Sequence, residues 1–180
     1  EYCFLNHQVK PDLDKLIHFE KILDRLKLVQ RPLGLTLTPV GEILAVPRMW
    51  HLLEHASRLK NLHSIEIWTN LSRDPEKLFN YISPEKLCVI GTYHPTQFKS
   101  FERENDLFFK RVERLMKVVK DLSVNFVIYE KNLPFLPQLK ERMAGLGVYL
   151  TVNPQVNSTN GYGAAIKPLS GDELSIAREM

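Results

Sequence analysis

Polar residues or glycine end five strand-like runs of this 180-residue sequence, and they are the residues best suited to bind a ligand. In parallel α/β folds the carboxyl ends of the strands lie at one edge of the sheet, where ligands bind. A carboxylate at that edge accepts hydrogen bonds from an amino group, and an amide or a hydroxyl both donates and accepts. The candidate binding residues are Gly41, Glu42, Asn70, Thr92, His94, Glu130 and Asn153.

Some of these positions have a purely structural alternative. Gly41 would let a ligand approach the backbone, but with Glu42 it would equally form a turn that carries a solvated carboxylate. Pro95 biases His94 toward an extended conformation and ends the strand. His94 is therefore predicted either to contact a ligand or to cap the strand.

His51, Glu54 and His55 form an H-x-x-E-H pattern, which occurs in inverted zinc peptidases. Two histidines at i and i+4 on a helix can share a zinc ion, and Glu54 would then be the general base. The alternative is a solvated helix face, because Arg58 lies on the same side of the helix. No later carboxylate can be singled out as a third zinc ligand.

The composition is that of an ordinary globular domain, with 44% hydrophobic and 25% charged residues. The net charge of +3 and the scattered Lys and Arg residues argue against a nucleic-acid partner. Charged residues break every apolar run well before the ~20 residues of a membrane span, and no signal peptide is recognisable. The two cysteines, Cys3 and Cys88, make no disulfide framework, so we expect a reducing, cytoplasmic setting.

Helix-like stretches with apolar residues at helical spacing separate the strand-like runs. We expect strands at residues 35–40, 64–70, 87–94, 124–130 and 148–153. We expect helices at residues 11–29, after Pro47, at 75–81, from a Ser100 N-cap to about residue 121, and at 133–144. Residues 157–163 are predicted to form a flexible loop, and residues 170–173 a capping box that opens a terminal helix.

The alternation of strands and helices predicts an α/β fold with right-handed crossovers. Two architectures fit, an open doubly wound sheet and a complete or partial (β/α) barrel. The sequence has neither a GxGxxG motif nor a Walker A loop, and polar groups end every strand, which favours the barrel. The apolar run at residues 87–90 is expected to be covered on both faces, with Cys88 in the core.

Four short segments resemble, in this order, the motifs of the radical S-adenosylmethionine (radical SAM) enzymes. Residues 1–4 (EYCF) resemble the end of the CxxxCxYC loop, with Cys3 as its third cysteine. Residues 40–43 (VGEI) stand where the family carries GGEP, and residues 68–71 (WTNL) match its TN strand ending. Residues 92–97 (TYHPTQ) resemble the strand end of a subgroup in which THP or YHP recurs.

The resemblance, which spans residues 1–153, implies a partial (β/α)6 barrel of parallel strands like that of TIM barrels, with its first strand missing from the sequence. It implies a single domain over residues 1–180, in which residues 157–180 form a C-terminal loop and helix. The first two cysteines of the loop are also absent, so we expect a fragment of a longer chain.

The function that the resemblance implies is that of a radical SAM enzyme. Three cysteine thiolates would hold a 4Fe–4S cluster, and SAM would chelate the fourth iron. Reductive cleavage of SAM would give a 5′-deoxyadenosyl radical that abstracts hydrogen from an unknown substrate, with a flavodoxin-type or ferredoxin-type electron donor as partner. The implied contacts are Cys3 for the cluster, Tyr2 for the adenine, Gly41 and Glu42 for the methionine amino group, Asn70, Thr92 and His94 for the ribose or carboxylate, and Glu130 and Asn153 for SAM or substrate.

Two other functions stay open at this point. One is a zinc-dependent hydrolase that uses His51, Glu54 and His55. The other is a non-catalytic α/β barrel that serves as a binding module.

Overall fold

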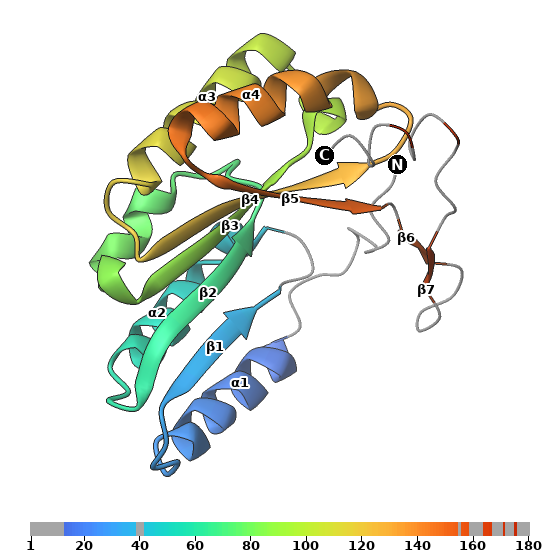
Figure 1. The fold of residues 1–180 in the computed structure, drawn as a ribbon. Coiled ribbons are helices and arrows are strands. Elements are labelled where there is room, and N and C mark those ends of the chain that lie inside the picture. The colour runs from blue at the N-terminus through green and yellow to red at the C-terminus, as the bar shows by residue number, and fades with distance from the viewer. Residues whose placement is uncertain are drawn as a thin grey trace.

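Five parallel strands form one curved sheet in which chain order and spatial order are the same (Figure 1). The computed structural model describes residues 13–38, 42–154, 156–158 and 164–166, together with Gly171 and Ser175. Each strand pairs with the next in parallel register, so the sheet grows by repeated strand–helix units. The strands are β1 (Leu33–Leu37), β2 (Leu62–Thr69), β3 (Leu87–Tyr93), β4 (Asp121–Ile128) and β5 (Tyr149–Pro154).

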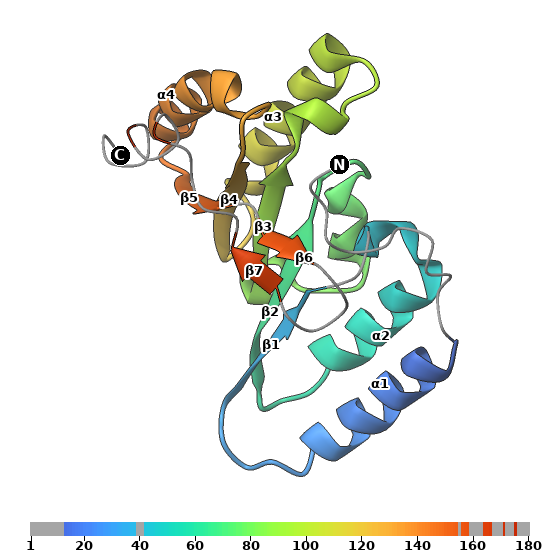
Figure 2. The same cartoon turned by 90° about the vertical axis from the view of Figure 1, so that its right-hand side faces the viewer.

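The four α-helices of the described chain lie on one face of this sheet, as the two views in Figures 1 and 2 show together. They are α1 (Leu13–Leu26), α2 (Pro47–Ser57), α3 (Phe101–Leu115) and α4 (Leu136–Leu146). Short 3₁₀ helices occupy several connections, at Ile43–Ala45, Pro75–Asn80, Pro84–Lys86, Pro95–Gln97 and Leu133–Phe135. Within the described part of the chain, no helix has the length and apolar character that crossing a membrane requires.

The hydrophobic core fills the space between the sheet and these helices. Alternate strand residues such as Val89 and Tyr93 of β3 are buried on the helical side, because side chains alternate between the two faces of a strand. The helices contribute one apolar stripe each, which for α3 consists of Phe108, Phe109, Val112 and Leu115. The curved sheet with helices on its outer face confirms the predicted partial barrel of parallel strands.

Several predicted ends of helices and strands were wrong, and the segment between α3 and β4 is an example. The helix expected to reach residue 121 ends at Leu115, and β4 already begins at Asp121. Ser100 stands at the N-cap of α3 without a side-chain cap bond. Instead Glu104 Oε1 accepts hydrogen bonds from the backbone N–H groups of Lys99 and Ser100, each at 3.1 Å. The carboxylate one turn into the helix thus holds the backbone before the helix, and the Ser100 hydroxyl makes no cap bond.

Part of the predicted flexible loop is a β-hairpin instead. Strand β6 (Val156–Ser158) pairs antiparallel with β7 (Ala164–Ile166), so residues 157–158 are strand. The hairpin lies beyond the carboxyl ends of the parallel strands, in front of them in Figure 2. The predicted capping box at residues 170–173 lies outside the described residues except for Gly171, which is helical.

Cys88 is not a core residue, contrary to the prediction. Leu87 and Val89 of β3 are buried toward the helices, whereas Cys88 and Ile90 face the opposite side and are half-buried. No helix of the described chain covers that side, so a continuous apolar run does not mean burial on both faces here. We call this side of the five-stranded sheet, opposite α1–α4, the inner face.

Candidate binding site at the carboxyl edge

The inner face carries side chains in rows that cross the strands, and their positions follow from the parallel register. Near the amino ends of the strands, Glu66, Cys88 and Asp121 stand side by side. The next row, two residues further toward the carboxyl ends of the strands, consists of Trp68, Ile90, Ser123 and Tyr149. The next row consists of Asn70, which directly follows β2, and of Thr92, Asn125 and Thr151. We call these four residues the polar row.

The polar row lies at the carboxyl ends of the strands and consists only of amides and hydroxyls. Asn125 is 5% exposed, and its Oδ1 accepts a 2.6 Å hydrogen bond from Asn153 Nδ2. A buried asparagine in a strand core costs free energy unless it is hydrogen-bonded, and Asn153 supplies that bond. The structure therefore brings the predicted residues Asn70, Thr92 and Asn153 together, and adds Asn125 between them.

Asn125 was missed by the sequence analysis, although a signal for it exists. It interrupts an otherwise apolar stretch of β4, whose other residues from Val124 to Ile128 are apolar. A polar side chain in the middle of a buried strand marks a position that faces something other than the hydrophobic core.

Glu42 lies at the same edge and accepts three hydrogen bonds. Its Oε1 accepts from the backbone N–H of Leu44 at 2.9 Å and from the Thr69 hydroxyl at 2.8 Å. Its Oε2 accepts from the backbone N–H of Asn70 at 2.8 Å. Glu42 thus both caps the 3₁₀ helix Ile43–Ala45 and joins the connection after β1 to the end of β2.

These bonds leave the Glu42 carboxylate with room for one more donor. A carboxylate offers about four lone-pair positions, and the three donors use two on Oε1 and one on Oε2. The remaining position on Oε2 is on the oxygen that faces Asn70, at the end of the polar row. An ammonium group placed there would make a charge-assisted hydrogen bond.

His94 directly follows β3 and stands at the N-cap of the 3₁₀ helix Pro95–Gln97. Its carbonyl accepts a hydrogen bond from the backbone N–H of Gln97 at 3.0 Å. Burial lowers the pKa of His94 to about 4, so its imidazole is neutral at pH 7. The neutral imidazole fits a role as a hydrogen-bonding group at this edge. The side chain makes no cap bond to the 3₁₀ helix, so the predicted capping role belongs only to the His94 backbone.

The remaining predicted residues are not brought to the polar row. Glu130 is exposed in a turn after β4, in which the backbone N–H of Asn132 donates to the carbonyl of Tyr129 at 2.8 Å. Tyr2, Cys3 and Gly41 lie outside the described residues.

A buried asparagine that the sequence analysis also missed joins two loops at this edge. Asn132 is fully buried, donates from Nδ2 to the Val127 carbonyl at 3.0 Å and accepts from the Thr96 hydroxyl at 3.1 Å. The Thr96 hydroxyl also makes a hydrogen bond with the Tyr129 hydroxyl. The loops that follow β3 and β4 are therefore tied together directly beside His94.

The two histidines of the H-x-x-E-H pattern have different neighbours, although His51 Nδ1 lies 3.9 Å from Glu54 Oε2. His51 packs edge-on against the Tyr81 ring at 5.9 Å, while His55 Nε2 lies 3.9 Å from Asp24 of α1. Glu54 instead forms a 2.5 Å ion pair with Arg58. The three side chains behave as a solvated helix face, and the geometry gives no support to the zinc-hydrolase alternative.

The residues present do not make a binding site for a 4Fe–4S cluster. Such a cluster needs three protein thiolates, and the sequence has two cysteines. Cys88 stands in the row at the amino ends of the strands, beside Glu66 and Asp121, and burial raises the pKa of its thiol, with Asp121 adding to the effect. Among the described residues, no group of three or more His, Cys, Asp or Glu side chains is placed to hold a metal ion.

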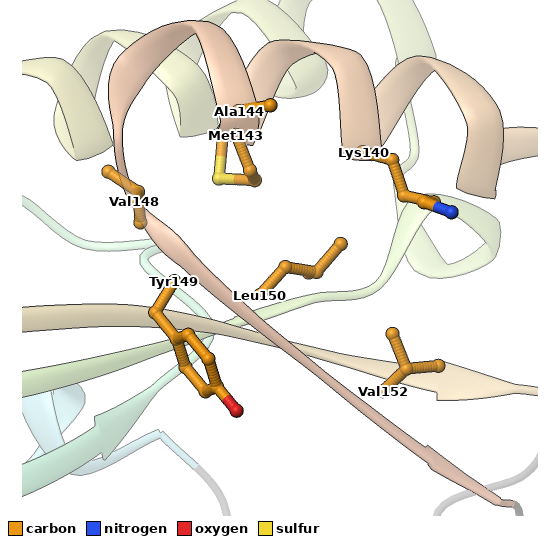
Figure 3. A pocket seen from close by; sticks show the side chains of 7 residues that line it. All are labelled: Lys140, Met143, Ala144, Val148, Tyr149, Leu150 and Val152. Atoms are coloured by element: carbon orange, nitrogen blue, oxygen red, sulfur yellow. The ribbon is translucent and has the colours of Figure 1, made fainter. Parts of the chain in front are cut away.

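A shallow pocket opens on the outer side of β5, where this strand forms the edge of the sheet (Figure 3). Its lining is mainly apolar and consists of Lys140, Met143, Ala144, Val148, Tyr149, Leu150 and Val152. It lies against α4, on the helical side of the sheet, and so is separate from the polar row of the inner face.

Solved structures share this arrangement. A structure of Streptococcus suis SuiB bound to S-adenosylmethionine matches 99% of the chain with a TM-score of 0.69 at 18% identity. A structure of anSMEcpe with bound AdoMet matches 90% of the chain with a TM-score of 0.57 at 15% identity. Both proteins are radical SAM enzymes. This chain has the radical SAM fold.

The match to the radical SAM fold covers only part of each of these proteins, 42% of the SuiB chain and 50% of the anSMEcpe chain. No family model matches the sequence, and no curated protein matches it. At identities below 20% the agreement lies in the order of strands and helices, and the chemistry has to be argued from the residues at the carboxyl edge.

Proposed function

We propose that this chain is the SAM-binding core of a radical SAM enzyme. The observation that carries the proposal is the polar row, which lies at the carboxyl edge of a sheet whose fold is shared with two proteins bound to S-adenosylmethionine. SAM presents an ammonium group, a carboxylate, ribose hydroxyls and an adenine, and each of these needs a hydrogen-bond partner. The carboxyl edge offers a carboxylate, amides, hydroxyls and a neutral imidazole.

The electrostatics of the edge fit a ligand of this kind. Glu42 is placed to accept from the ammonium group of SAM, because one lone-pair position on its Oε2 remains. Asn70, whose backbone N–H donates to Glu42, and Thr92 beside it in the polar row offer an amide and a hydroxyl to the ribose or the carboxylate. Asn125 and Asn153, which are bonded to each other, extend the same surface toward β5.

The proposal includes a radical reaction that depends on a 4Fe–4S cluster, and the residues of this chain alone do not supply all the ligands of that cluster. A bound 4Fe–4S cluster supplies the electron for reductive cleavage of SAM in radical SAM enzymes, and Cys3 would be one of its ligands. Because the sequence holds two cysteines and Cys88 lies at the other end of the strands, a complete donor set needs thiolates from elsewhere. The substrate and a flavodoxin-type or ferredoxin-type electron donor belong to the same proposal.

Binding of SAM to the purified chain tests the proposal without the cluster. Titration calorimetry of the 180-residue chain should detect binding of SAM. Thr92→Val removes one hydroxyl from the polar row with little change in shape, and should weaken binding by about two- to tenfold, the range for one lost hydrogen bond.

Thr36→Val is the matched control. Thr36 of β1 also lies on the inner face of the sheet, but it stands beside Glu66 and away from the polar row. This variant should bind SAM as the original chain does. Absence of SAM binding, or equal weakening in both variants, would contradict a SAM site at the carboxyl edge and would favour the non-catalytic barrel.

A further inference from the structure

Leu71 has an unusual backbone conformation immediately after the candidate site. Its φ is +53°, and it is the one residue other than glycine with a positive φ in the described part of the chain. A left-handed conformation is unfavourable for an ordinary L-residue, because its Cβ comes too close to the following carbonyl oxygen. The side chain is also 1% exposed, so the surrounding structure must hold both the backbone and the side chain in place.

Three contacts hold this turn. The backbone N–H of Leu71 donates to the Thr69 hydroxyl oxygen at 3.0 Å, and its carbonyl accepts a hydrogen bond from Nη1 of Arg111 on α3. Its side chain fills the space beside Gly91, where an added Cβ would lie 2.9 Å from Leu71 Cδ1. The turn after β2 is thus fixed by β3 on one side and by α3 on the other.

The same turn supplies two of the three donors to Glu42. The Thr69 hydroxyl donates to Glu42 and at the same time accepts from Leu71 N–H, and the backbone N–H of Asn70 donates to Glu42 Oε2. A continuous chain of hydrogen bonds therefore runs from Glu42 through Thr69 and Leu71 to Arg111. Loss of the bond to the Leu71 carbonyl would free the turn that orients Glu42 and Asn70.

We propose that Arg111 is a positioning residue of the candidate SAM site. By holding the Leu71 carbonyl, it keeps the turn after β2 in the conformation in which Asn70 N–H and the Thr69 hydroxyl meet the Glu42 carboxylate. The proposal rests on the proposed function only in naming SAM as the ligand of that carboxylate.

Arg111 is half-buried, and part of this burial has a cost. Its Nε is buried and has no acceptor among the described residues, which is a cost that an apolar side chain of similar length would avoid. Burial also lowers the pKa of the guanidinium, although Asp74 and Glu42 oppose this effect. What the arginine provides in return is the bond to Leu71 and a positive charge close to Glu42.

Arg114, one turn further along α3, provides a matched control. It carries the same charge, is 48% exposed and forms ion pairs with Asp74 at 3.6 Å and Glu76 at 3.1 Å. It shares the acidic neighbour Asp74 with Arg111. Arg111→Met and Arg114→Met therefore remove one charge each from the same helix, and only Arg111→Met removes the bond to Leu71.

Two measurements on these variants test the proposal. Amide hydrogen exchange, followed by NMR, should become at least about tenfold faster at Asn70 and Leu71 in Arg111→Met and stay unchanged in Arg114→Met. SAM should bind about tenfold more weakly to Arg111→Met alone. If Arg111→Met fails to fold, Arg111→Ala, with Arg114→Ala as its control, replaces the pair in both measurements.

The outcomes separate this proposal from the proposed function. Equal exchange at Asn70 and Leu71 in the variants of Arg111 and Arg114 would overturn the positioning role. Faster exchange in the Arg111 variant alone, in a chain that binds no SAM, would support the positioning role and reject the SAM site.

Discussion

Thr69 shows how one hydroxyl connects residues that are distant in the sequence. It donates to Glu42 on the preceding connection and accepts from the backbone of Leu71, which in turn is bonded to Arg111 of α3. Two of these bonds join other elements to the end of β2, and the bond between Leu71 and Thr69 closes the turn between them. At the scale of single residues, hydrogen bonds around this one turn therefore organise the carboxyl edge. The Leu71 side chain fits into the turn because Gly91 has no side chain to occupy the same space.

Gly91→Ala should destabilise the protein, because the added Cβ would lie 2.9 Å from Leu71 Cδ1 and 3.6 Å from Phe108 Cζ. We expect the free energy of unfolding to fall by about 1–3 kcal/mol, the usual cost of overpacking a core. Urea denaturation of the two proteins measures the difference.

Gly145→Ala is the control for this substitution. Gly145 lies inside α4, and a Cβ there would meet no atom within 4 Å. Alanine should therefore raise the free energy of unfolding by about 0.5–1 kcal/mol through its higher helix propensity. Similar stabilities of the Gly91 and Gly145 variants would show that Leu71 is not confined by Gly91.

The connections after β3 and β4 act as one unit at the scale of elements. Asn132 reaches back to the Val127 carbonyl and across to the Thr96 hydroxyl, and Thr96 also meets Tyr129. Aromatic contacts continue this link, since Phe101 at the start of α3 lies 5.1 Å from Phe135 before α4. The two loops therefore hold His94 and the end of β4 in a fixed relation.

Asn132→Ala should loosen this unit. The substitution leaves the buried Val127 carbonyl without its side-chain donor and removes an acceptor from Thr96, so the free energy of unfolding should fall by about 1–3 kcal/mol. Asn80→Ala, at an exposed asparagine, should change it by less than about 0.5 kcal/mol. Urea denaturation compares the two variants, and equal effects would contradict the linking role of Asn132.

At the scale of the whole molecule, the two faces of the sheet differ: one packs against the helices in the hydrophobic core, and the other carries mixed rows of which the last is polar. The four described α-helices cover the outer face, and the inner face carries the polar row and the neighbouring rows. This division lets the candidate site lie on the inner face at the carboxyl edge without interrupting the hydrophobic core. His94 lies at that edge and is the histidine whose burial makes the stability of the whole fold depend on pH.

The stability of the protein should decrease as the pH falls from about 6.5 to about 4. An unfolded histidine has a pKa near 6.5, and burial lowers the pKa of His94 in the folded protein to about 4. Between these values the unfolded state takes up a proton that the folded state does not, so the contribution is fully present above the unfolded pKa and is lost as the pH falls.

Urea denaturation at about pH 7.5 and pH 5 should show a loss of the order of 2 kcal/mol from this group. His94→Gln, which cannot take up a proton, should lose correspondingly less stability over the same interval. An identical loss in both proteins would mean that His94 is accessible to protons in the folded state.

The order of the elements and the edge that carries the site could be predicted from the sequence alone. Alternating or continuous apolar runs located all five parallel strands, because these patterns are local properties of the chain. Gly147 ends α4 with a φ of +68°, a conformation that favours glycine. A glycine that follows a helical pattern predicts such a helix end from the sequence alone. The polar residues after the strands likewise predicted the carboxyl edge, where Glu42, Asn70, Thr92, His94 and Asn153 are found.

The partners of those residues were decided only by the tertiary structure. Whether Glu42 contacts solvent, a ligand or Thr69 depends on how the end of β2 packs against the preceding connection. The exposure of Cys88 depends on whether helices cover one face of the sheet or both faces. A run of apolar residues in the sequence is the same in either arrangement. The roles of Asn125, Asn132 and Arg111 also arise from contacts between distant segments, because the register of the strands and the packing of α3 place them, and these are global properties of the fold.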